Sequence, residues 1–297
     1  MEPHVTIGMC TRNNESTIQE AITSVVRQGF PLELLELIIV DGNSNDNTLS
    51  LVHENLDAKV KTKIFSENKG LGYARQIVVS NAAGKYIVWV DGDMILSRDY
   101  VSKLFAFMES HSEAGIIKGK QALRSGGNLL ATLEVYSRVA GKMVDYSSKR
   151  AFSKVLGTSG SIYRVVAIRQ VGGFDENLRG YCEDWDAEIK VRAAGWSLST
   201  LSIEYVDYER NKLTWEDLWK RYWLRGYYTH YFLHKKPGLI KHFKMFPPAA
   251  FLAGLFQSRT LFGMTRQKKV FLLPFQHLFK FSAWYVGFLR SHLQSYQ

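Results

Sequence analysis

The chain of 297 residues contains only two cysteines, Cys10 and Cys182. So few cysteines exclude a disulfide-stabilised scaffold and are typical of a protein in a reducing compartment. The first residues, Met1–His4, lack the basic and apolar regions of a secretory signal peptide, so none is expected. We also find no internal repeat and no low-complexity tract. The length and the hydrophobic content of 46% indicate one large globular domain, or one domain with an appendage.

Acidic residues are scarce in the last third of the chain. Residues 210–297 contain 15 Lys and Arg but 2 Asp and Glu, a net charge of +13. Residues 1–209 contain 23 Lys and Arg and 26 Asp and Glu, a net charge of −3. The two parts together give the total net charge of +10. We therefore predict a catalytic domain over residues 1–209 and a helical, basic and aromatic-rich region over residues 210–297. A region of the second kind is expected to contact an anionic surface.

The most informative segment is Lys85–Met94. Residues 86–90 form a continuous apolar run, typical of a parallel strand buried on both faces. Asp91 and Asp93 follow it on either side of Gly92, at the end of the strand where ligands bind in open α/β sheets. Two carboxylates there suit Mg²⁺ or Mn²⁺ carrying a diphosphate. By itself the tripeptide is equally compatible with an ordinary turn.

Three further strands, separated by helices, precede this segment: Val5–Thr11, Leu37–Asp41 and Val60–Phe65. Strands alternating with helices predict an α/β fold with a mostly parallel sheet and helices on both faces. Polar residues follow three of the four strands, around Asn13, at Asp41 and at Asp91, and would meet in one crevice. Gly70-Leu-Gly72 lacks the third glycine of a dinucleotide-binding loop and does not follow the first strand, which excludes a dinucleotide cofactor site.

The next segments continue the alternation. Residues 114–120 predict a strand, and residues 128–144 predict a helix followed by a polar loop over residues 145–153. Gly157–Arg164 is a strand of small residues that a ligand can approach closely. A further helix begins near Glu183 with three carboxylates in its first turn, which also suit the helix dipole without any catalytic role.

Taken in order, these segments resemble the family 2 glycosyltransferases with the GT-A fold, over roughly residues 4–205. No single motif is decisive, and the identification depends on their shared order. The motifs are Thr11–Glu15, Val40–Thr48, Asn68–Gly70 with Ala74-Arg75, Asp91–Asp93, Gly157–Gly160, Val171–Asp175, Glu183-Asp184 and Gly195-Trp196. The resemblance implies a GT-A (Rossmann-like) catalytic domain and transfer of sugar with inversion at the anomeric carbon.

The resemblance implies a donor site at the ends of the strands. Asp41 would hydrogen-bond the base, Arg75 would support the nucleotide, and Asp91 would face the ribose or the metal. Asp93 would coordinate the Mn²⁺ or Mg²⁺ that bridges the two phosphates and neutralises the leaving diphosphate. The full set of nucleotide-sugar residues is Thr11, Arg12, Asn13, Glu15, Asp41, Arg75, Asp91, Gly92 and Asp93.

The resemblance also implies the residues on the acceptor side. Asp184 matches the general base that takes the proton from the attacking acceptor hydroxyl. Glu183 would support Asp184 or touch the acceptor. Gly160, Ser161 and Trp185 would lie on the sugar and acceptor side, where small residues let the ligand lie against the backbone.

Three departures from the family pattern leave points open. Arg12 stands where many members carry an aromatic residue that stacks on the base, although arginine can still stack or pair with phosphate. No histidine near residues 207–210 matches the extra metal ligand of some GT-A enzymes, so ligands beyond Asp93 remain open. The processive-synthase signature Gln-x-x-Arg-Trp is absent, and Arg221-Tyr-Trp223 is only a loose equivalent, which favours one sugar per encounter.

The basic region begins with a capping-box-like helix start at Thr214. Three tryptophans, every fourth residue from Trp215 to Trp223, lie on one helix face, which we expect to pack on the catalytic domain. Two apolar stretches, residues 243–262 and 270–289, are interrupted by proline or polar residues. Their mixture of Phe, Leu and Trp with Lys and Arg is typical of helices in a membrane interface. A re-entrant or spanning hairpin, and a soluble cap or dimer surface, remain alternatives.

These observations predict a metal-dependent, inverting glycosyltransferase at the cytoplasmic face of a membrane. Its partners would be a nucleotide-sugar donor, a glycan or lipid-linked acceptor and the membrane surface, and no nucleic acid, because no nucleic-acid-binding module is recognised. Sugar transfer to a polyprenyl phosphate is an alternative, since an ionised acceptor needs no general base. A non-catalytic nucleotide-binding or membrane-scaffold protein on a GT-A fold is the third reading.

Overall fold

The computed structural model describes residues 2–141, 155–206, 212–235 and 245–294. The chain divides into two compact units. The first consists of residues 1–122, 145–179 and 183–207, and the second of residues 123–144, 180–182 and 208–297. The predicted division at residue 209 assigned residues 123–144 to the first domain, whereas the structure groups them with the C-terminal helices. The predicted loop over residues 145–153 and the tetrapeptide at 207–210 lie outside the described residues.

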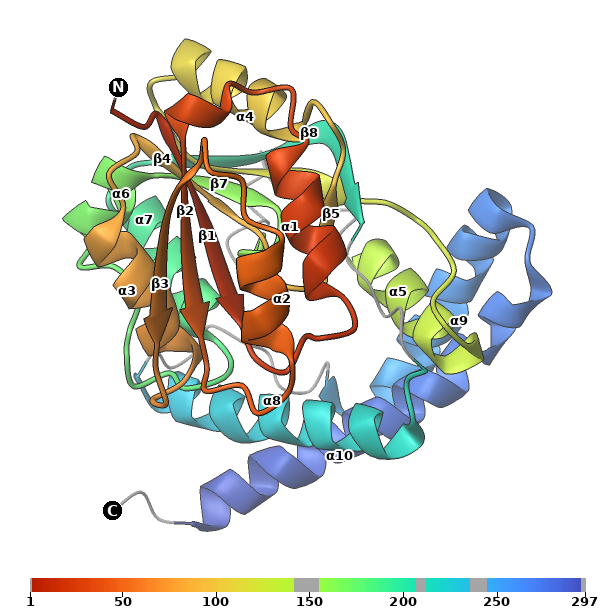
Figure 1. Ribbon diagram of the computed structural model, residues 1–297. Helices are drawn as coiled ribbons and strands as arrows, with labels where there is room; N and C mark the ends of the chain where they lie inside the picture. Colours follow the sequence, from red (N-terminus) through yellow and green to blue (C-terminus); the bar gives the residue numbers. More distant parts are fainter. Residues whose placement is uncertain (1, 142–154, 207–211, 236–244, 295–297) are drawn as a thin grey trace. The chain divides into compact units, whose positions relative to one another are not determined.

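The first unit is built on one sheet with the strand order β3-β2-β1-β4-β7-β6-β8-β5 (Figure 1). The strands are β1 (Val5–Thr11), β2 (Leu35–Asp41), β3 (Lys61–Ser66), β4 (Tyr86–Trp89), β5 (Ile95–Leu96), β6 (Ala114–Gln121), β7 (Ser161–Arg164) and β8 (Ser197–Val206). Strands β1 to β4 are mutually parallel where they pair, and β8 is parallel to β6. The remaining pairs, those of β7 with β4 and β6 and that of β5 with β8, are antiparallel. The mostly parallel α/β sheet is therefore present, with β5 and β8 as strands that the apolar pattern did not indicate.

The register brings the ends of the first strands to one edge of the sheet. Thr11 at the end of β1 lies opposite Asp41 at the end of β2, and Asp41 lies opposite Ser66 at the end of β3. Because parallel strands all point the same way, the residues that follow them leave the sheet on the same side. The polar segments predicted to meet are thus placed together by strand register.

Helices cover both faces of this sheet. They are α1 (Ile18–Val26), α2 (Thr48–Glu54), α3 (Leu71–Asn81), α4 (Tyr100–Ser110), α6 (Val165–Gln170) and α7 (Glu183–Ala193), with a short 3₁₀ helix η1 (Leu32–Leu34). Successive residues of a strand point to opposite faces. On β1, Ile7 and Met9 belong to the buried core with Ile22 of α1, whereas Gly8 leaves room for Val78 of α3 on the other face.

The second unit contains four α-helices and one 3₁₀ helix within its described residues. They are α5 (Leu129–Gly141), α8 (Trp215–Lys235), α9 (Pro247–Thr265), η4 (Lys268–Leu272) and α10 (Leu273–Leu293). The predicted capping box is present, because Thr214 and Asp217 exchange hydrogen bonds at the start of α8. Trp215 and Trp219 contact the ring of Phe279 in α10, so these two tryptophans pack within the helical unit.

Helices α8 and α10 cross at two glycines. A Cβ atom on Gly226 would clash with the carbonyl oxygen of Trp284, and one on Gly287 would clash with the carbonyl oxygen of Trp223. Each helix therefore presents a bare backbone patch to the other, which allows a close crossing. Among the helices that the structure describes, none combines the length and apolarity needed to cross a membrane.

A buried ion pair joins α5 to α10. Glu134 and Lys280 are both almost fully buried, and Lys280 Nζ donates to Glu134 Oε2 at 3.0 Å. The Tyr222 hydroxyl donates to the other carboxylate oxygen at 2.9 Å. Burial opposes ionisation, but the charges of Lys280 and Arg138 lower the pKa of Glu134 to about 2. The helical unit therefore holds a charged, hydrogen-bonded pair in its interior.

Candidate active site

Two loops at the ends of β1 and β2 are joined by hydrogen bonds. The backbone N–H of Asn13 donates to Ser44 Oγ, and that of Asn45 donates to Asn13 Oδ1. The N–H of Asn14 donates to Thr48 Oγ1 at 2.7 Å. Asn13 has a φ of 52°, in the left-handed region that asparagine tolerates better than most residues. The segment predicted to wall the nucleotide pocket is thus a defined loop pair, with both Arg12 and Glu15 exposed.

Asp41 is buried at the end of β2 and supports this loop pair. Its Oδ2 accepts a hydrogen bond from the N–H of Ser44 at 2.9 Å, and its Oδ1 accepts one from the Ser44 hydroxyl. The side chain is only 1% exposed. The structure thus shows Asp41 organising the turn after β2.

The turn Asp91-Gly92-Asp93 follows β4. Both aspartates are half-buried, and the N–H of Met94 closes the turn on the carbonyl of Asp91 at 3.0 Å. Thr17 Oγ1 donates to the carbonyl of Gly92 at 2.9 Å. A Cβ on Gly92 would lie 2.8 Å from Thr11 Oγ1, so only glycine fits without displacing Thr11.

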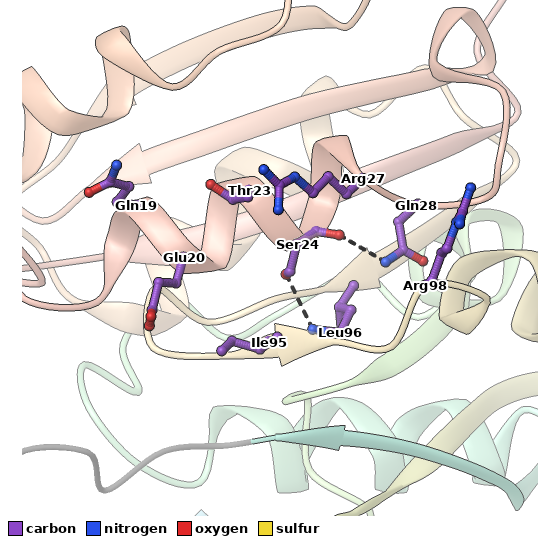
Figure 2. A pocket seen from close by; sticks show the side chains of 9 residues that line it. All are labelled: Gln19, Glu20, Thr23, Ser24, Arg27, Gln28, Ile95, Leu96 and Arg98. Carbon is purple, nitrogen blue, oxygen red and sulfur yellow. Dashed lines mark hydrogen bonds between the residues drawn. The ribbon is translucent and has the colours of Figure 1, made fainter.

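The strand that follows this turn is held by α1. The N–H of Leu96 donates to Ser24 Oγ, and Gln28 Nε2 donates to the carbonyl of Ser24 (Figure 2). A shallow cavity of about 840 Å³ opens between α1 and β5 beside these bonds. Its lining contains none of the predicted site residues. The bond between Leu96 and Ser24 fixes the chain three residues after Asp93.

The loop before β7 closes the site on another side. Gly160 has a φ of 70°, and its N–H donates to the carbonyl of Trp89 at 2.9 Å. Ser161 is fully buried, and its hydroxyl donates to the carbonyl of Gly157 at 2.6 Å, so it holds the loop's shape. Ser159 Oγ donates to Asp91 Oδ2, which links this loop to the aspartate turn. Sequence reasoning did not single out Ser159.

Helix α7 begins with two neighbouring carboxylates, those of Glu183 and Asp184. Glu183 is 3% exposed and forms an ion pair with Arg75, whose guanidinium also lies over the ring of Trp89. Burial raises the pKa of Glu183 to about 7, against the opposing charge of Arg75. Asp184 is half-buried and accepts a hydrogen bond from the N–H of Trp185, which is also half-buried. Arg75, predicted to support the nucleotide, is thus placed against Glu183.

Two buried side chains, Lys118 and Glu188, clamp the loop beside Asp184. Lys118 Nζ donates to the carbonyls of Leu156 and Gly157, at 2.6 and 3.0 Å. Glu188 accepts from the N–H groups of the same two residues, at 2.8 and 2.6 Å. Burial and then the charge of Asp184 raise the pKa of Glu188 to about 8. The available signals were a lysine inside an apolar strand and a glutamate one helical turn after Asp184.

These contacts make one constellation from segments far apart in the sequence. Thr11 touches Gly92, Asp91 bonds to Ser159, and a Cβ on Gly157 would lie 3.4 Å from Asp184 Oδ2. Across the described ranges, no cluster of three or more His, Cys, Asp or Glu side chains is arranged to bind a metal on its own. Asp91 and Asp93 nevertheless offer hard oxygen ligands at the open edge of the sheet, which fit Mg²⁺ or Mn²⁺ when a substrate supplies phosphate oxygens.

Family models match most of the chain. The model described as glycosyl transferase family 2 matches residues 6–149, and the model described as glycosyl transferase family group 2 matches residues 86–291. The chain is 32% identical over 114 residues to the poly(ribitol-phosphate) β-N-acetylglucosaminyltransferase TarS of Staphylococcus aureus. That match covers 37% of this chain and 20% of TarS. It is 24% identical over 235 residues to the probable glycosyltransferase YdaM of Bacillus subtilis, covering 75% and 55% of the two chains. The chain thus spans between a fifth and little more than half of these relatives.

Solved structures share the fold. The mannosyltransferase PcManGT of Pyrobaculum calidifontis, in complex with GDP-Man and Mn²⁺, matches with a TM-score of 0.66 at 16% identity. That match covers 97% of this chain and 88% of PcManGT. Residues 1–349 of S. aureus TarS, in complex with UDP-GlcNAc, match with a TM-score of 0.57 at 18% identity. This match covers 99% and 93% of the two chains. The predicted GT-A fold, with a helical C-terminal segment, is confirmed.

Proposed function

This chain is a family 2 glycosyltransferase, and from that premise we propose that it transfers one sugar per encounter from a nucleoside diphosphate donor, with inversion, to a glycan or lipid-linked acceptor. The observation that carries the proposal is the hydrogen bond from Ser159 to Asp91. It joins the loop in front of Asp184 to the turn that holds the donor-side aspartates. The residues that we propose for the donor and for the acceptor therefore belong to one constellation in the first unit.

On the donor side, Asp91 and Asp93 would hold the divalent ion. Both are half-buried carboxylates on a turn fixed by Thr17 and by the glycine between them. A site of one or two carboxylates completed by substrate phosphates is the usual way in which proteins bind Mg²⁺. When bound, the ion neutralises charge on the leaving diphosphate. The loops ordered by Asp41 would receive the nucleoside.

On the acceptor side, Asp184 would act as the general base. Glu183 is buried and paired with Arg75, so Asp184 is the more accessible carboxylate of the two. Its Oδ2 faces the loop that Lys118 and Glu188 hold in place. A positioned base of this kind contributes roughly 10²–10⁴-fold to the rate.

The relatives favour a hydroxyl-bearing polymer as acceptor, since one is named for poly(ribitol-phosphate) and another, from Staphylococcus epidermidis, for poly-β-1,6-N-acetyl-D-glucosamine. Transfer to a polyprenyl phosphate is the alternative, and the need for a general base distinguishes the two acceptors. An ionised phosphate acceptor presents no proton to remove. Asp184 would then be dispensable while Asp93 would not.

Donor binding is the first test. We expect calorimetry with UDP-GlcNAc, GDP-Man and other nucleotide sugars to show binding of one nucleotide class that strengthens with Mn²⁺. Asp93→Asn should weaken that binding at least tenfold, because it removes a charged oxygen ligand. Asp99→Asn is the matched control, since Asp99 is exposed and pairs with Lys103 on the surface. If none of the donors binds, the hypothesis of a non-catalytic protein would be favoured.

Transfer is the second test. Asp184→Asn should keep donor binding within about threefold of wild type while lowering transfer to a hydroxyl acceptor by roughly 10²–10⁴-fold. Transfer that survives both Asp93→Asn and Asp184→Asn would refute the proposal. Transfer to polyprenyl phosphate that survives only Asp184→Asn would identify the alternative acceptor.

A further inference from the structure

The second unit exposes a group of large apolar side chains on α9, η4 and α10. Phe256 is 76% exposed, Phe275 is 60% exposed and Phe271 is 50% exposed. Monomeric soluble proteins rarely expose large contiguous apolar patches, and such patches often mark a site of interaction. We call the group the α9–α10 apolar face; it consists of Leu252, Leu255, Phe256, Phe271, Phe275 and Leu278.

Two ring contacts join α9 to the phenylalanines of η4 and α10 that belong to this face. Phe275 packs edge-on against Phe251 with ring centroids 5.6 Å apart, and Phe271 packs against Phe262 at 5.2 Å. Within α9, Leu255 and Phe256 follow Leu252 by three and four residues, so both lie next to it on one side of the helix.

The opposite side of α9 is the side that packs inward. Its buried residues are Ala250, Gly254, Ser258 and Leu261. Gly254 lies so close to Pro274 of α10 that a Cβ there would be 2.7 Å from the proline Cα. Within the described residues, α9 thus packs inward through another set of residues, and the α9–α10 apolar face is exposed.

The charge of this segment identifies the kind of partner. The chain contains no Asp or Glu after Asp217, so its last 80 residues carry only basic charged side chains. Arg259 follows Phe256 by one helical turn and is exposed, and Arg266 and Lys268 are exposed between α9 and η4. Basic side chains beside an apolar face attract anionic lipid headgroups while the apolar side chains enter the acyl region.

We propose that the α9–α10 apolar face docks on an anionic lipid bilayer, with Phe256, Phe271 and Phe275 entering the interface and Arg259, Arg266 and Lys268 contacting headgroups. A soluble polyanion would use the basic groups but leaves the phenylalanines in water, which disfavours it as the occupant. The proposal does not depend on the catalytic one, because it concerns a surface in the helical unit.

The test is flotation of the full chain with lipid vesicles at 50 mM NaCl. We expect binding to vesicles of phosphatidylcholine and phosphatidylglycerol at 7:3, and at least tenfold weaker binding to pure phosphatidylcholine. The double variant Phe256→Glu/Phe275→Glu should lose binding to the anionic vesicles by at least tenfold. Val166→Glu is the matched control, since Val166 is 64% exposed in the first unit. Circular dichroism checks that both variants are folded.

Other outcomes overturn the proposal. Vesicle binding unchanged in the double variant would show that the apolar face is not the contact. Self-association of the wild type that the double variant abolishes, without vesicle binding, would assign the face to a second copy of the chain. Binding only to a soluble polyanion such as heparin would show that the basic segment binds an anionic polymer and not a bilayer. Asp93→Asn should float like wild type, so loss of donor binding and loss of docking are separable.

Discussion

At the scale of single residues, the shape of the candidate site depends on a few closely packed positions. Gly92 sits between two aspartates and against Thr11, with no room for a side chain. Ser161 is buried to hold a loop, and Arg75 is buried against Glu183. Some residues of the site are thus placed to shape it, while Asp91, Asp93 and Asp184 keep accessible carboxylates. The roles of all of them in catalysis stay predictions.

Gly92→Ala tests this scale. Its new methyl group would lie 2.8 Å from Thr11 Oγ1, so the turn must shift, and overpacking of this kind costs about 1–3 kcal/mol. We expect a lower free energy of unfolding in urea and weaker donor binding. Gly263→Ala is the control, because no atom lies within 4 Å of its Cβ and alanine favours the helix. Donor affinity unchanged in Gly92→Ala would show that the turn does not position the donor.

At the scale of elements, buried polar side chains hold together segments that are far apart in the sequence. Lys118 and Glu188 fix the loop before β7, Lys118 through its carbonyls and Glu188 through its N–H groups. The Glu134–Lys280 pair joins α5 to α10 in the other unit. Removing one member of such a pair leaves a buried charge without its partner, whereas removing both is often tolerated.

Lys280→Met tests the ion pair between Glu134 and Lys280. We expect the free energy of unfolding in urea to fall by up to about 3–5 kcal/mol at pH 7, because Glu134 stays buried without the Lys280 ammonium and Arg138 remains only at 3.6 Å from its other oxygen. The double variant Glu134→Gln/Lys280→Met should recover most of the loss. Lys220→Met is the control, since Lys220 forms an exposed pair with Glu216 and should change stability by less than about 1 kcal/mol.

The same pair has a pH dependence with a definite sign. The folded protein lowers the pKa of Glu134 from an ordinary 4.5 to about 2, so its ionised form stabilises the fold above pH 4.5. That contribution is lost as the pH falls from 4.5 towards 2. Urea unfolding of wild type over this window should show a stability decline that Glu134→Gln/Lys280→Met reduces. An equal decline in both proteins would assign the acid sensitivity to other carboxylates.

At the scale of the whole molecule, the candidate active site and the excess of basic residues belong to different parts of the chain. The candidate active site lies in the first unit, and the long segment without acidic residues belongs to the second. Surface charges act over about a Debye length, roughly 10 Å at 0.1 M salt and 3 Å at 1 M. Partly buried interactions are screened much less.

The salt concentration should therefore affect vesicle binding and donor binding differently. Between 50 and 500 mM NaCl, we expect binding to anionic vesicles to fall at least tenfold, while donor binding with Mn²⁺ changes by less than about threefold. Flotation and calorimetry on the same preparation measure both. Vesicle binding that ignores salt would mean that the basic side chains contribute little and that apolar contact alone accounts for docking.

The sequence by itself determined the α/β class, the order of the first four strands and helices, and the family, because these depend on local periodicity and on motif order along the chain. It also pointed to Asp91, Asp93 and Asp184 through their places at the ends of elements. Only the tertiary structure decided that residues 123–144 join the helical unit, that β5 and β8 complete the sheet, and that Ser159, Lys118 and Glu188 assemble the loop beside Asp184. Those outcomes rest on contacts between residues about 30 to 150 positions apart, where strand pairing and burial override any local pattern.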